Sequence, residues 1–180
     1  MNDLDFIKDP VLRKTLEDSI EYIYALYEET KQDGQKPLYR EETYRVIVLY
    51  VVSAIEAVLF YFYKTRGKKI TKINYRCIQT LSTSYQNKEK PGLPVIIAVQ
   101  EDEERKDYEL GLYELVKFFL TLKLIQEKTA KEILAMNQMR NTFHFNKPRP
   151  QICDKEQVEN ALRLLVHTLQ NAPKSLEIKK

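Results

Sequence analysis

The feature that most constrains the fold is an apolar run from Val46 to Tyr63, 18 residues interrupted only by Ser53 and Glu56. A run of this length is just sufficient for a helix that crosses a bilayer. A carboxylate at position 56 would be costly in hydrocarbon, and no second run of this kind follows. We therefore expect the run to be the buried central helix of a soluble bundle, with no membrane association.

The length and composition favour a mainly α fold. The 180 residues suit one core, and 31% charged residues with only four glycines are typical of long helices rather than of a turn-rich β fold. We predict a bundle of about five helices. It would form a single domain over residues 1–173, followed by a flexible tail at 174–180.

Apolar residues recur at helical spacing in several segments that capping and breaking residues delimit. Thr129 with Glu132, and Asp154 with Gln157, match the capping box that opens a helix, and Pro173 is expected to end the last one. The expected helices cover residues 3–30, 39–64, 108–124, 129–143 and 155–173.

The segment from 67 to 107 differs from the rest of the chain. Apolar and polar residues alternate from Ile70 to Cys77 and again in parts of 95–99, after the turn-forming sequence 91–94. This alternation indicates strands. We expect a small two-stranded or irregular insertion here.

The charge and the reactive residues exclude several classes of protein. The formal net charge of +3 identifies no partner. The two histidines and two cysteines are not spaced as metal ligands, and the glycine-rich loops of nucleotide or dinucleotide sites are absent from the sequence. We therefore expect no metal and no cofactor. Free thiols and the absence of a signal-peptide pattern favour the cytoplasm.

A candidate site lies at the end of the helix expected to begin at 129. If that helix continues to 144, Ile133, Asn137, Arg140 and His144 share one face. Arginine is always charged and histidine titrates near neutrality, so such a pair can bind a phosphate and move a proton. The competing interpretation is that these side chains merely cap the last carbonyls of the helix.

The pair Arg140-Asn141 followed by His144, before a proline-rich loop and a final helix, resembles the HEPN superfamily of helical nucleases and nucleic-acid-associated domains. The segment 44–64 is similar to the long central helix of such domains, and the likeness covers residues 40–172. Only three residues separate Arg140 from His144. That gap is shorter than in the nuclease members.

The resemblance implies a homodimer in which arginines and histidines of two copies form one cleft without a metal. Arg140 would hold the scissile phosphate, His144 would act as general acid or base, and Asn141 would orient them or bind phosphate. RNA would be the substrate, in a bacterial defence or toxin-antitoxin system with a cognate antitoxin or other partner protein. The alternative is a catalytically inactive binding or scaffolding module of the same family.

Glu56 needs a partner, because a buried unpaired carboxylate is unfavourable. One hypothesis pairs it with Arg140, which would fix the guanidinium. The alternative is that Glu56 faces a loop, solvent or a tyrosine hydroxyl.

The basic residues Lys68, Lys69 and Lys72 form a second candidate site, where nucleic acid could bind. An equally dense acidic run covers residues 101–109. If the two runs pair across the insertion, this basic surface is neutralised.

Overall fold

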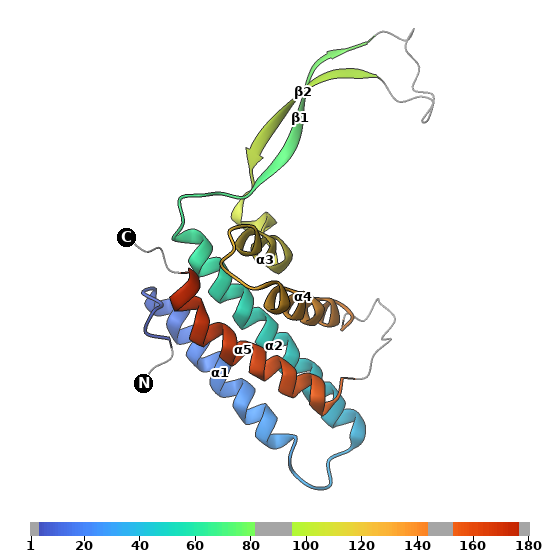
Figure 1. Ribbon diagram of the computed structural model, residues 1–180. Helices are drawn as coiled ribbons and strands as arrows, with labels where there is room; N and C mark the ends of the chain where they lie inside the picture. Colours follow the sequence, from blue (N-terminus) through green and yellow to red (C-terminus); the bar gives the residue numbers. More distant parts are fainter. Residues whose placement is uncertain (1–3, 82–94, 144–152, 177–180) are drawn as a thin grey trace. The chain divides into compact units, whose positions relative to one another are not determined.

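The computed structural model describes residues 4–81, 95–143 and 153–176. In these residues the chain forms five α-helices and a two-stranded antiparallel sheet (Figure 1). The predicted mainly α fold with a small β insertion is therefore confirmed. The elements in chain order are α1 (Pro10–Glu29), α2 (Pro37–Lys64), β1 (Thr71–Thr80), β2 (Ile96–Glu104), the short 3-10 helix η1 (Asp107–Glu109), α3 (Leu112–Thr121), α4 (Glu127–Asn141) and α5 (Lys155–Leu176).

The chain divides into two compact units. The helical unit comprises residues 1–67 and 110–180, and the second unit comprises residues 68–109. The second unit contains the β1–β2 hairpin and η1. It corresponds to the insertion expected over residues 67–107.

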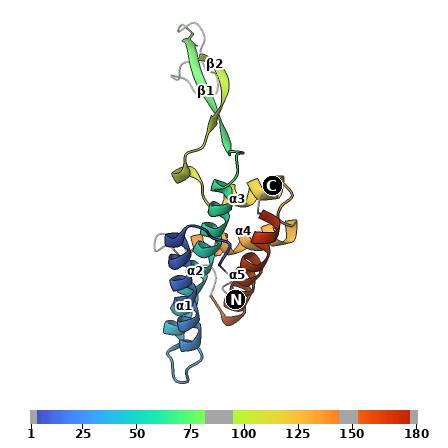
Figure 2. The same ribbon diagram turned by 90° about the vertical axis from the view of Figure 1, so that its left-hand side faces the viewer.

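Helix α2 is the centre of the helical unit, and α1, α3, α4 and α5 all contact it (Figures 1 and 2). Its side chains are buried on several faces, including Ile47, Val51, Ile55 and Val58. The helix is long and apolar enough to cross a membrane, but 56% of its most apolar window is buried inside the protein. The predicted buried central helix is therefore confirmed, because neighbouring helices cover the apolar run.

The first helix begins later than predicted. α1 starts at Pro10 rather than at residue 3, because the Asp9 carboxylate accepts hydrogen bonds from the N–H groups of Val11 and Leu12 at 2.9 and 3.1 Å. Asp9 is thus the N-cap, and the proline occupies a first-turn position that needs no N–H donor. The preceding turn still contributes Leu4 and Ile7 to the core.

The predicted start of α4 at Thr129 is also wrong. The N–H of Ala130 already donates to the carbonyl of Gln126 at 2.9 Å, so the helix begins at Glu127. A carboxylate in the first turn favours this start, because it faces the positive end of the helix dipole. The helix ends at Asn141, before the predicted end at Phe143.

The start of α5 is as predicted, but its end is not. The Asp154 carboxylate accepts from the N–H of Gln157 at 2.9 Å, and the Gln157 side chain accepts from the N–H of Asp154 at 3.2 Å. This is the expected capping box. Pro173 does not end the helix, which continues to Leu176. Leu176 is only 1% exposed, and the Arg66 guanidinium donates to its carbonyl.

The first prediction concerns the central helix. Replacing Ile55, which is 1% exposed, by alanine removes buried methyl groups and leaves a cavity. We expect Ile55→Ala to lower the free energy of unfolding by about 3 kcal/mol in urea titrations. Leu49→Ala on the exposed side of the same helix is the control, with an expected change of about 0.5 kcal/mol or less. Equal losses at both positions would contradict the central burial of α2.

Candidate functional site at the end of α4

An ion pair joins α2 to the last turn of α4. The Nη1 atom of Arg140 donates to Oε2 of Glu56 at 2.8 Å. The two side chains are 21% and 28% exposed, so the pair is partly shielded and still reachable from solvent. The hypothesis that Glu56 pairs with Arg140 is therefore confirmed. Glu56 is tolerated in the apolar run because the guanidinium offsets its charge.

The start of α3 contributes a second carboxylate to these surroundings. Glu114 accepts a hydrogen bond from the backbone N–H of Gly111 at 3.2 Å. A side chain at Gly111 would begin 3.3 Å from the Glu114 carboxylate and 4.0 Å from the Glu56 carboxylate. Both acids therefore lie beside the same glycine, and this glycine leaves them room.

The other residues predicted for the site differ in their burial, and one of them is not described. Asn137 is half-buried, and its Oδ1 atom is buried with no donor among the described residues. Asn141 is the last residue of the helix and is half-buried. His144 lies outside the described residues. Because α4 ends at Asn141, the expected continuous helical stripe from Ile133 does not reach position 144.

Arg45 is a buried charged residue that the sequence analysis did not single out. It forms ion pairs with Glu41 and Glu42 on its own helix, and its guanidinium lies 5.4 Å from the centre of the Phe143 ring. Position 45 precedes Glu56 by three helical turns, so both lie on the same side of α2. This helical spacing from Glu56 is the sequence signal that could have identified Arg45 as a residue near the site. Glu56 contacts the last turn of α4, and Arg45 contacts Phe143, two residues after that helix ends.

Cys153 is buried just before α5 begins. Burial raises the pKa of its thiol to about 12, although the nearby Arg45 acts in the opposite direction. A thiol with this pKa is almost entirely protonated at neutral pH and is a poor nucleophile. Cys153 therefore contributes packing rather than covalent chemistry.

The basic residues of the hairpin pair with the acidic run. Lys69 lies 3.1 Å from Glu104, and Lys72 lies 2.7 Å from Glu109. Lys72 also lies 3.9 Å from Glu103. The hydrogen bond from Lys72 is the main cause of the lowered pKa of the Glu109 carboxyl.

Further along the hairpin, Arg76 lies 2.9 Å from Glu101. The interpretation that the two runs pair is therefore confirmed. Lys68 is exposed, and no ion pair involves it in the part of the chain that the structure describes. Nucleic-acid binding by Lys68, Lys69 and Lys72 stays a prediction.

Within the described ranges, no group of three or more histidine, cysteine, aspartate or glutamate side chains could hold a metal ion. Comparisons of the chain with protein-family models, curated proteins and solved structures found no match. The likeness to HEPN domains thus depends on the residues of the chain itself, with Arg140-Asn141 and His144 as its motif.

The second prediction concerns the Glu56–Arg140 pair. In a double-mutant cycle with Glu56→Gln and Arg140→Gln, we expect a coupling free energy of about 1 to 2 kcal/mol, because the charged hydrogen bond is partly shielded from water. The control is Lys14–Asp18, which has a similar distance of 2.7 Å but is 70% and 57% exposed. Its coupling should be about 0.5 kcal/mol or less. Equal coupling in both cycles would contradict the shielding.

The third prediction separates the two thiols. Cys77 is exposed and Cys153 is buried with a raised pKa. At pH 8 the native protein should react with a thiol reagent at one fast site, and Cys77→Ser should remove that fast phase. The second thiol should react only after denaturation. A fast phase that persists in Cys77→Ser would show that Cys153 is accessible.

Proposed function

We propose that this chain is an RNA-directed protein of the HEPN type and a metal-independent endoribonuclease. Its site would be formed by Arg140, Asn141 and His144 of two copies of the chain. The observation that supports this proposal best is the Glu56–Arg140 ion pair, which holds a guanidinium in a fixed position at a partly exposed helix end.

The chemistry of Arg140 fits the contact with a phosphate. A guanidinium has five N–H donors in a rigid fork and stays charged at any physiological pH. The bond to Glu56 uses the Nη1 atom. The guanidinium can therefore be oriented by the carboxylate while other donors face the phosphate. Such an oriented cation stabilises the charge that develops on a phosphorane.

His144 supplies the proton transfers of the proposed reaction. A neutral imidazole can remove the proton of a ribose 2′-hydroxyl, whose oxygen then attacks the adjacent phosphorus. A protonated imidazole can donate to the departing 5′-oxygen. Two copies of the chain would provide one histidine for each role. The amide of Asn141, one residue after Arg140, would bind a phosphate oxygen or orient the pair.

A second candidate function is a catalytically inactive HEPN-like module that binds or assembles with a partner. The acidic surroundings favour it: Arg140 is already paired with Glu56, and Glu114 lies beside the same glycine. Two carboxylates around this glycine, one of them bound to the guanidinium, would weaken the attraction for an anionic substrate. In either case we propose a cytoplasmic homodimer, and a cognate antitoxin or other protein as its partner in a bacterial defence setting.

The fourth prediction tests the nuclease. The purified protein, incubated in EDTA with single-stranded and structured RNA, should cleave RNA. His144→Ala and Arg140→Ala should each lower the rate of cleavage about 100-fold or more. The histidine variant loses the proton transfer, and the arginine variant loses the contact with the phosphate. His167→Ala, at the exposed histidine on α5, is the control and should cleave at the wild-type rate.

The outcomes distinguish the two functions when folding is checked by circular dichroism. Cleavage that both site variants lose supports the nuclease. Absence of cleavage by a folded wild-type dimer contradicts it and favours the inactive module. Cleavage that survives in His144→Ala would show that the activity comes from elsewhere.

A further inference from the structure

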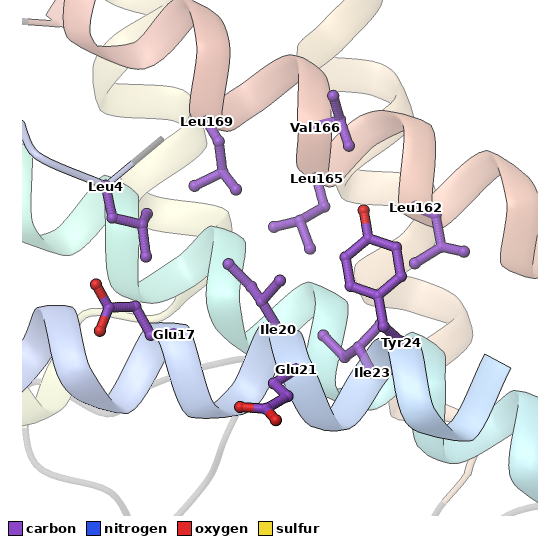
Figure 3. Close-up of a pocket in the computed structure, with 10 residues that line it drawn as sticks. All are labelled: Leu4, Glu17, Ile20, Glu21, Ile23, Tyr24, Leu162, Leu165, Val166 and Leu169. Carbon is purple, nitrogen blue, oxygen red and sulfur yellow. The ribbon is translucent and has the colours of Figure 1, made fainter. Parts of the chain in front are cut away.

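An apolar groove runs between α1 and α5, on a part of the helical unit that the proposed nuclease site does not use (Figure 3). Its volume is about 320 Å³. Ile20 and Ile23 of α1 and Leu165 and Leu169 of α5 point toward one another across it. The groove exists because α1 and α5 each pack on α2 and leave apolar side chains between them.

The groove is bounded and partly open. Leu4 lies at one end, and Tyr24 extends toward α5 near the other (Figure 3). Beyond Tyr24, the hydroxyl of Tyr27 donates to Glu159 at 3.0 Å and bridges the two helices. Tyr24 and Val166 are 54% and 41% exposed, so the apolar parts of these two side chains contact water at the groove.

The charges at the groove are all of one sign. Glu17 and Glu21 line it from α1, and none of the lysines, arginines and histidines in the described part of the chain does. The neighbouring acids Asp18 and Glu28 pair with Lys14 and Lys31. Among the residues that the structure describes, neither Glu17 nor Glu21 forms an ion pair, and the charge of Lys14, which acts on both, is already paired with Asp18. Two carboxylates one turn apart repel each other, and a cation placed near both would relieve this repulsion.

We propose that this groove binds an amphipathic helix of another protein, which inserts aliphatic side chains and places lysine or arginine against Glu17 and Glu21. A helix fits because the groove follows two helices, and apolar side chains at i, i+4 and i+7 of a partner would lie along it. A second copy of the chain fits less well, since no basic side chain among the described residues lines the groove and the nearby Lys14 is already paired with Asp18.

The fifth prediction tests this with a displayed library of helical peptides. Each peptide carries Leu, Ile or Phe along one face of the helix and either Lys or Glu, chosen at random, at the positions that flank this face. The full chain is the protein against which the peptides are selected. We expect selection to enrich Lys over Glu beside the stripe. The selected peptides should bind the double variant Glu17→Gln/Glu21→Gln at least about tenfold more weakly, because the ion pairs to the peptide are lost. They should not bind the variant Val166→Asp, because it places a charge in the apolar groove.

The control is Asp33→Asn/Glu132→Gln, which changes the net charge equally at acids that do not line the groove. It should bind like the wild type. Thermal unfolding of each variant checks that the helical unit is intact. Failure to enrich Lys, or undiminished binding by the groove variants, would overturn the proposal. Self-association of the chain that Val166→Asp abolishes would overturn it as well, because a second copy would then be the occupant.

Discussion

The structure depends on the burial of α2. Its apolar side chains cannot remain in water without a large free-energy cost, so the other helices must cover them. α1, α3, α4 and α5 all pack against this one helix. The position of each surrounding helix is therefore set mainly by the part of α2 that it covers. The candidate site is a place where that cover is incomplete, because Glu56 of α2 is 28% exposed there.

Burial of α2 also explains the position of Arg140. Glu56 would be destabilising in this helix without a cation, and the end of α4 supplies the guanidinium at 2.8 Å. The contact fixes the end of α4 relative to α2, and it leaves the pair partly exposed. One interaction thus serves the fold and presents a charged group at the surface. The same acidity weakens the attraction for phosphate, and for that reason an inactive module is the competing function.

Much of the fold was accessible from sequence because the relevant forces are local. The apolar run predicted α2, and Asp154 with Gln157 predicted the start of α5. Two errors concerned the starts of helices, where Asp9 caps α1 and α4 begins at Glu127 for local reasons. The error at the end of α5 arose because tertiary contacts decide there. Pro173 should end a helix, yet the burial of Leu176 and its bond from Arg66 keep the last turn helical.

The candidate site was only partly accessible from sequence. A carboxylate in an apolar run requires a partner, and Arg140 was one candidate for Glu56. Helical periodicity alone does not show whether Glu56 contacts Arg140 or faces solvent. The pairing of Lys72 with Glu109 depends on the geometry of the hairpin and η1, and the sequence only indicated that opposite charges were present. Arg45 was not predicted as a site residue, because it directly precedes the apolar run and a charged residue at the end of such a run needs no partner.

We propose that the end of α4, rather than the hairpin, is the main contact with RNA. This proposal is tested most directly by photo-cross-linking the protein to RNA that contains 4-thiouridine and identifying the linked peptides by mass spectrometry. We expect the cross-links in peptides that span Arg140 and Asn141, at the end of α4, because the free donors of the guanidinium would hold the backbone there. Cross-links confined to the hairpin around Lys68 and Lys72, or to no single region, would contradict the account.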